Sequence, residues 1–154
     1  MRITRLTDYG VVLLTYFARE ATGTMHNARD LALMAHLPLP TVSKVLKVLA
    51  RNGFLIAHRG AKGGYSLAKR PQEITVAQVV DAVEGHMAIT KCSEDVTGNC
   101  ELITLCPVQN NWQRITVAVQ KAMESITLAD MCQPLRLDFA VHGSAQTLGR
   151  STTA

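Results

Sequence analysis

The stretch PTVSKVLKVLARNG, at residues 40–53, decides the fold of this chain. Its apolar residues recur at i, i+3, i+4 and i+7, the spacing of one buried helix face: Val42, Val45, Leu46 and Leu49. Its basic residues lie on the opposite face: Lys44, Lys47 and Arg51. Pro40 suits a first helical turn, where an N–H would have no partner, and Gly53 suits the end. The stretch therefore predicts a helix over residues 40–52 with a buried side and a basic outer side.

Two further helices are predicted before this stretch. Periodic apolar residues indicate a first helix over residues 6–20, with Thr7 as its cap. Asn27 is placed to cap a short helix over residues 27–37, with Leu31 and Met34 facing inward, and Pro38 then breaks the chain. A short helix, a tight turn and a second helix with a basic outer face form a helix-turn-helix arrangement.

A β-hairpin with a basic, glycine-rich tip follows the third helix. Residues 54–58 and 65–68 have the composition of strands, and RGAKGG at residues 59–64 forms the turn between them. The glycines permit tight turning and close approach to a phosphate backbone. A nucleotide-binding phosphate loop is disfavoured because the Lys-Ser/Thr ending of that motif is absent. Placed after a helix-turn-helix, the hairpin is interpreted as a wing.

The second half of the chain predicts two main helices. Thr75 and Gln78 have capping-box spacing for a helix that stops at Gly85. A long helix begins near residue 107, and its apolar residues repeat at spacings of 3 and 4: Trp112, Ile115, Val119, Ala122 and Ile126. This stripe needs a partner, either its own domain or a second copy of the chain. Helix-turn-helix proteins usually bind as dimers, so we expect a homodimer.

The charge of the chain is divided unevenly. Residues 1–70 carry eleven Lys and Arg against three Asp and Glu, a net of +8, whereas residues 71–154 carry five against nine, a net of −4. A basic first half favours DNA or RNA as a partner, although an ordinary uneven surface would give the same count. No run of about eighteen apolar residues exists, and the N-terminus lacks a signal-peptide pattern. We therefore expect no membrane partner and a cytoplasmic location.

Three cysteines, Cys92, Cys100 and Cys106, lie within fifteen residues, and Cys132 lies apart. Clustered thiols in an intracellular chain indicate metal or redox chemistry more often than disulfides. Thiolates suit iron–sulfur clusters, zinc or copper(I). The intervals of seven and five residues match neither paired zinc ligands nor the common ferredoxins. The spacing alone leaves open a soft metal, a redox function, or free cysteines with or without one disulfide.

Several motifs together resemble one family of regulators, through about residue 132. They are LTDY at residues 6–9, RGAKGGY at 59–65, VDAVEG at 80–85, the three spaced cysteines, and ITLADM at 126–131. The family they resemble is the iron–sulfur-sensing winged-helix regulators, which include IscR-like and NsrR-like members. LPTVSK at residues 39–44 and NWQRI at 111–115 most resemble the branch that regulates SUF cluster-assembly operons.

Residue pattern and resemblance together imply a mainly α fold with a small β-hairpin wing, that is, a winged helix-turn-helix plus a long dimerisation helix. The implied parts are a DNA-binding domain at residues 1–85, a cysteine loop at 86–106, a dimerisation helix at 107–132 and a flexible tail at 133–154. The resemblance further implies one iron–sulfur cluster per subunit, with 2Fe–2S favoured over 4Fe–4S. Cys92, Cys100 and Cys106 would hold it, and its occupancy would control operator binding.

The fourth cluster ligand is the point where the chain departs from the IscR-like pattern. Those members place a histidine three residues after the third cysteine, where this chain has Gln109, a poor iron ligand. NsrR-like members instead use an aspartate in the first helix of the partner subunit, and the matching residue here is Asp8. The alternative for Asp8 is a first-turn carboxylate that the helix dipole favours.

These features predict a repressor of SUF-type iron–sulfur cluster assembly genes that binds a double-stranded DNA operator, is not an enzyme and takes no small-molecule substrate. The alternatives are a nitric-oxide-sensing repressor of the same family, a cluster-carrying electron-transfer protein, and a DNA-binding protein with inert cysteines. The residues expected to enter the major groove are Thr41, Ser43, Lys44 and Lys47. The residues expected to contact phosphates or the minor groove are Arg2, Arg5, Arg59 and Lys62.

Overall fold

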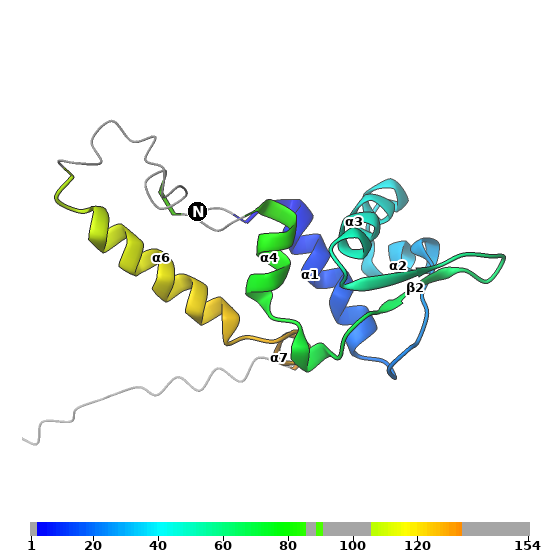
Figure 1. Ribbon diagram of the computed structural model, residues 1–154. Helices are drawn as coiled ribbons and strands as arrows, with labels where there is room; N and C mark the ends of the chain where they lie inside the picture. The colour runs from blue at the N-terminus through cyan, green and yellow to red at the C-terminus, as the bar shows by residue number, and fades with distance from the viewer. Residues whose placement is uncertain (1–2, 86–88, 91–105, 134–154) are drawn as a thin grey trace, which may run out of the picture.

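The computed structural model describes residues 3–85, 89–90 and 106–133 (Figure 1). Its elements in chain order are the helices α1 (Arg5–Ala18), α2 (Ala28–Ala35) and α3 (Leu39–Arg51), the strands β1 (Leu55–His58) and β2 (Gly64–Leu67), the 3-10 helix η1 (Pro71–Glu73), and the helices α4 (Val76–Glu84), α6 (Gln109–Glu124) and α7 (Leu128–Met131). We call residues 3–85 the head.

The helices of the head enclose an aliphatic core. In Figure 1, α1 lies at the centre, with α4 on one side and α2 and α3 on the other. Burial of these side chains stabilises the head, at roughly 1.5–3 kcal/mol for each large aliphatic group. The predicted stripe of α3 is fully part of this core, which contains Leu13, Leu14, Phe17, Leu31, Val42, Val45, Leu46, Leu49, Phe54, Leu55, Ile74 and Val79.

Two local predictions were wrong. The N-cap of α1 is Thr4 and not Thr7, because Thr7 is fully buried and its hydroxyl donates to the Glu84 carboxylate at 2.6 Å. Met34 is 41% exposed, because the narrow buried face of α2 is filled by Leu31 and its neighbour Ala32. The caps of the other helices agree with the sequence: Asn27 caps α2, and Thr75 forms a capping box with Gln78.

The wing is attached to the head through its second strand. β1 and β2 pair antiparallel, in register from Leu55 opposite Leu67 to His58 opposite Gly64. The His26 N–H donates to the Tyr65 carbonyl at 2.9 Å, and the Tyr65 N–H donates back to the His26 carbonyl at 2.8 Å. A Cβ at Gly64 would lie 2.6 Å from the His26 carbonyl oxygen, so only glycine allows this approach.

The helix α6 extends away from the head, and α7 returns to it (Figure 1). Two backbone hydrogen bonds join the segment between α6 and α7 to the segment before α4. The Val76 N–H donates to the Ile126 carbonyl at 2.9 Å, and the Leu128 N–H donates to the Ile74 carbonyl at 2.7 Å. Leu128 is 2% exposed and belongs to the core of the head. α7 therefore anchors the C-terminal end of α6 to the head.

The observed architecture confirms the predicted mainly helical fold with one antiparallel hairpin. None of the described helices is long and apolar enough to cross a membrane.

Candidate nucleic-acid interface

The outer face of α3 is basic and carries no acidic side chain. Lys44, Lys47 and Arg51 are exposed, whereas the opposite side of the helix is buried. Within the described part of the chain, none of these three cations forms an ion pair with a carboxylate. Thr41 and Ser43 lie half-buried on the flanks of the same helix. This face therefore presents free positive charge, with two hydroxyl groups beside it, to a polyanion.

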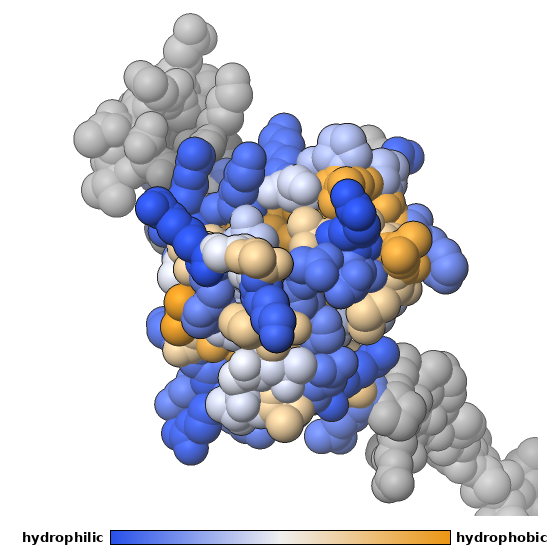
Figure 2. All heavy atoms as spheres, turned by 90° about the vertical axis from the view of Figure 1, so that its right-hand side faces the viewer, coloured by the Kyte–Doolittle hydropathy of each residue, from blue (hydrophilic) through white to orange (hydrophobic). Residues whose placement is uncertain are grey.

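The tip of the wing carries two more exposed cations, Arg59 and Lys62. Gly60 has a φ of +119°, which side-chain-bearing residues rarely adopt, and it allows the tight turn between the strands. His58 Nε2 and Ser66 Oγ are hydrogen-bonded at 2.8 Å between the two strands, close to the turn. Figure 2 looks onto this side of the molecule, where hydrophilic side chains predominate around separate hydrophobic patches.

The recognition helix and the wing lie on one side of the head. In Figure 1, α3 and the hairpin are both on the side of α1 that faces away from α6. The structure thus brings the predicted groove-entering residues of α3 and the predicted backbone-contacting residues of the wing onto the same half of the molecule.

The N-terminus of α1 contains a contact that sequence reasoning missed. Arg5 is exposed in the first turn, and Arg2 lies outside the described residues. The Glu84 carboxylate accepts hydrogen bonds from the Thr7 hydroxyl at 2.6 Å and from the Thr4 N–H at 2.7 Å. These bonds, that of Thr7 foremost, hold the pKa of Glu84 below its ordinary value. The partners are 77 and 80 residues apart, so no local pattern could have indicated the contact.

The expected cluster ligands lie only partly within the described residues. Cys106 is half-buried just before α6, and Asp8 is exposed in the first turn of α1. Cys92 and Cys100 lie outside the described residues. Among the side chains that the structure describes, no group of three His, Cys, Asp or Glu could hold a metal ion. A half-buried thiol and an exposed carboxylate are, by donor type, suitable ligands for iron.

Cys132 is separated from the cysteine loop by α6, which at 16 residues is about 24 Å long. Its Sγ lies 3.8 Å from the Thr15 carbonyl oxygen of α1. Burial raises the pKa of the Cys132 thiol above its ordinary value. Cys132 is therefore a packing thiol at the junction of α7 and α1.

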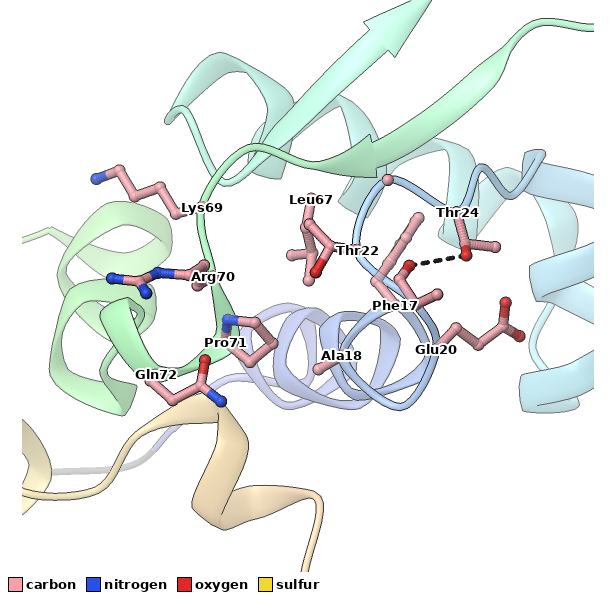
Figure 3. A pocket seen from close by; sticks show the side chains of 12 residues that line it. Phe17, Ala18, Glu20, Thr22, Thr24, Leu67, Lys69, Arg70, Pro71 and Gln72 are labelled. Atoms are coloured by element: carbon pink, nitrogen blue, oxygen red, sulfur yellow. Dashed lines mark hydrogen bonds between the residues drawn. The ribbon is translucent and has the colours of Figure 1, made fainter.

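A surface hollow of about 410 Å³ lies between the end of α1 and the chain that follows β2 (Figure 3). Phe17, Leu67 and Pro71 line it, while the side chains of Lys69 and Arg70 point away from it. Arg70 instead pairs with Glu73 at 3.0 Å on the surface. No sequence motif indicated this hollow, and its polar side chains do not converge on a common point.

A helix-turn-helix with a basic second helix, followed by a hairpin with a basic tip, defines a winged-helix DNA-binding regulator. Over residues 3–134 the chain matches the Rrf2 family, described as "Iron-dependent Transcriptional regulator". The chain therefore belongs to the Rrf2 family of transcriptional regulators.

Relatives and solved structures agree with this class. The HTH-type transcriptional regulator NsrR of Halalkalibacterium halodurans is 28% identical over 131 residues, which cover 85% of this chain and 90% of that protein. The structure of CymR, the global cysteine regulator of B. subtilis, has a TM-score of 0.68 at 23% identity and covers 86% of this chain and 96% of that chain. The structure of T. potens IscR has a TM-score of 0.65 at 24% identity, with coverage of 85% of each chain.

Two expectations are settled by these likenesses. The relatives and structural neighbours are transcriptional regulators, so the prediction that the chain is not an enzyme is confirmed. The family that the motifs resembled is confirmed as well. The SUF branch is not supported, because the relatives found carry other names.

Proposed function

We propose that this regulator is a homodimeric, cytoplasmic repressor whose binding to a double-stranded DNA operator depends on an iron–sulfur cluster. The observation that carries the proposal is the acid-free outer face of α3, where Lys44 and Lys47 are exposed and unpaired among the described residues. A helix of this kind fits the major groove, and lysine can donate to guanine edges or to phosphates. Arg59 and Lys62 at the wing tip would contact the phosphates alongside, as would Arg2 and Arg5.

The dimer is supported by the apolar stripe of α6, which a single chain leaves open. Trp112, Ile115 and Ile126 are 38%, 45% and 41% exposed. Thr116, which borders the stripe beside Trp112 and Val119, is the buried residue of this helix, and Val119 is half-buried. Apolar side chains along one helix face are stabilised when a second copy of the same helix covers them. Two copies would also place two recognition helices on one operator.

Cluster dependence is supported by the donor set of the chain. Cys92, Cys100 and Cys106 would supply three thiolates, and Asp8 of the partner subunit would supply a carboxylate, a harder and weaker ligand. When bound, a 2Fe–2S cluster supplies a centre that oxidants or iron loss can alter. A bound cluster can shift the protein toward its DNA-binding conformation only by the difference in the cluster's binding free energy between the two conformations.

The target genes and the signal are the most specific parts of the proposal. The motifs at residues 39–44 and 111–115 favour SUF-type cluster assembly genes. The similarity to NsrR, together with Asp8, favours the second candidate, a nitric-oxide-sensing repressor. Release from DNA by nitric oxide, at concentrations that leave iron loss undetectable, would identify the second candidate.

The experiment that tests the proposal is selection of duplexes from a random-sequence pool by the anaerobically purified protein. Lys44→Ala and Lys47→Ala should each weaken binding and lower the salt dependence by about one unit of slope per lost phosphate contact. Ser43→Ala should change base preference more than the slope. Lys121→Ala, an exposed cation on α6, is the matched control and should bind as wild type. Unchanged affinity of Lys44→Ala, Lys47→Ala and Arg59→Ala at physiological salt would place the DNA interface elsewhere.

A further inference from the structure

The helix α3 begins with a turn that is mainly apolar. Its first two residues, Leu39 and Pro40, are exposed, and the large hydrophobic side chain of Leu39 leaves the residue 40% exposed. The basic residues of the outer face begin only at Lys44. In the turn before it, the Thr41 hydroxyl is the one side-chain hydrogen-bonding group. The N-terminal end of α3 therefore differs in chemistry from the rest of its outer face.

Leu39 lies on the side of α3 that is expected to meet DNA. It precedes Ser43 by four residues, as Pro40 precedes Lys44, and residues four apart are neighbours on a helix surface. The Cα–Cβ bonds of a helix tilt toward its N-terminus, so the side chain of the first residue extends past the helix end. In helix-turn-helix proteins, the N-terminal residues of the second helix contact base edges. Leu39 thus occupies such a position without a hydrogen-bonding group.

A leucine in the major groove distinguishes bases by apolar contact alone. Adenine, guanine and cytosine present donors and acceptors there, and a side chain needs a matching polar group to read them. Thymine also presents a 5-methyl group, which apolar side chains contact. Because neither Leu39 nor Pro40 can donate or accept through its side chain, thymine is the base whose edge fits this turn.

We propose that Leu39, with Pro40 beside it, is a specificity-determining residue that contacts the 5-methyl group of a thymine in the operator. The inference rests on the proposed DNA-binding function and adds to it the base that the first turn of α3 selects. Lys44 and Lys47 contribute positive charge, whose effect depends on salt. Leu39 contributes a preference for thymine at one position, and this preference is independent of salt.

The test removes only the methyl group from the DNA. The full-length wild-type protein selects a duplex from a random-sequence pool, and each thymine of that duplex is then replaced in turn by deoxyuridine. This base keeps the O4 acceptor and the pairing of thymine but lacks the 5-methyl group. At one thymine position, affinity should fall by about fourfold, which corresponds to the burial of one methyl group. The salt dependence should stay unchanged, because no phosphate contact is lost.

Three variants assign this effect to Leu39. Leu39→Ala should bind the thymine and deoxyuridine duplexes with equal affinity at that position and keep the wild-type salt slope. Alanine favours a helix, and the replaced side chain is exposed, so the variant should fold. Leu39→Met keeps an apolar side chain of similar size and should retain the fourfold difference. The matched control is Leu33→Ala, the same change at a leucine of α2 that is 71% exposed, and it should retain the difference too.

Two results would overturn the inference alone while the wild type still binds its selected duplex. One is that deoxyuridine weakens wild-type binding at no thymine position. The other is that Leu39→Ala keeps every difference between thymine and deoxyuridine that the wild type shows. Failure of the wild type to select any duplex would overturn the proposed function and this inference with it.

Discussion

At the scale of single residues, the cysteines differ in what surrounds them. Cys106 is half-buried at the end of the cysteine segment, just before α6. Cys132 packs against the Thr15 carbonyl at the other end of that helix, and burial raises the pKa of its thiol. A thiol with a raised pKa is a poor source of the thiolate that metals bind. The two cysteines should therefore behave differently toward iron.

The first prediction compares the four cysteines. Cys92→Ala, Cys100→Ala and Cys106→Ala should each lose bound iron and visible absorption after anaerobic purification, because each removes one thiolate ligand. Cys132→Ala serves as the control and should retain both. Iron and sulfide analysis with an absorption spectrum measures the outcome. Equal iron content in all four variants would refute the ligand assignment.

The second prediction concerns the fourth ligand. Asp8→Ala should still assemble some cluster but lose it faster in air, with a shifted spectrum and weaker operator binding, because a weakly held position is left open. Gln109→Ala at the start of α6 should change little. Cluster lifetime is followed by absorbance in air-saturated buffer. An Asp8→Ala protein that matches wild type in spectrum, lifetime and DNA affinity would leave Asp8 as a first-turn carboxylate only.

At the scale of helices and strands, features that depend on residues close together in the sequence could be predicted, whereas long-range contacts could not. The stripe and basic face of α3, the Asn27 and Thr75 caps, and the hairpin follow from residues a few positions apart. The bridge between Thr75 and Thr127 and the Glu84 contact involve partners far apart in the chain. The basic part of the candidate site was therefore predictable, whereas the contacts that hold its elements in place were not.

The third prediction tests α7 as an anchor. Leu128→Ala should lower the free energy of unfolding by roughly 2–5 kcal/mol, because it leaves a cavity in the core between α7, α1 and α4. Denaturant unfolding measures the change. Met131→Ala, at an exposed position of the same helix, is the control and should cost little. Similar unfolding free energies for both variants would show that α7 is not a stabilising part of the head.

At the scale of the whole molecule, α6 projects from the head (Figure 1), and Trp112, Ile115 and Ile126 of its apolar stripe are exposed. The head supplies the DNA-binding face, and the helix supplies the surface through which two heads would be joined. Which second surface covers the stripe could not be read from the sequence, because a periodic apolar face fits either its own domain or a second copy.

The fourth prediction therefore concerns the dimer. Val119→Glu should place an unpaired carboxylate in the centre of the α6 stripe, and its burial would cost several kcal/mol. Sedimentation should then show monomer or aggregate, and affinity for the selected duplex should collapse. Gln113→Glu adds the same charge at an exposed position away from the stripe and should remain dimeric. A Val119→Glu dimer of unchanged mass and affinity would move the interface to another surface.

The two anchors at Glu84 and Ile126 have a consequence for the chain between them. Because both ends of residues 85–125 are tied to one compact unit, this stretch is a closed loop and not a free appendage. The entropy of closing such a loop grows only slowly with its length, by about 0.6 kcal/mol for each doubling. Extra residues inserted before α6 would therefore reduce the folding stability of the head very little. The length and spacing of the cysteine segment are therefore only weakly constrained by folding, and they are free to vary with the chemistry of its thiols.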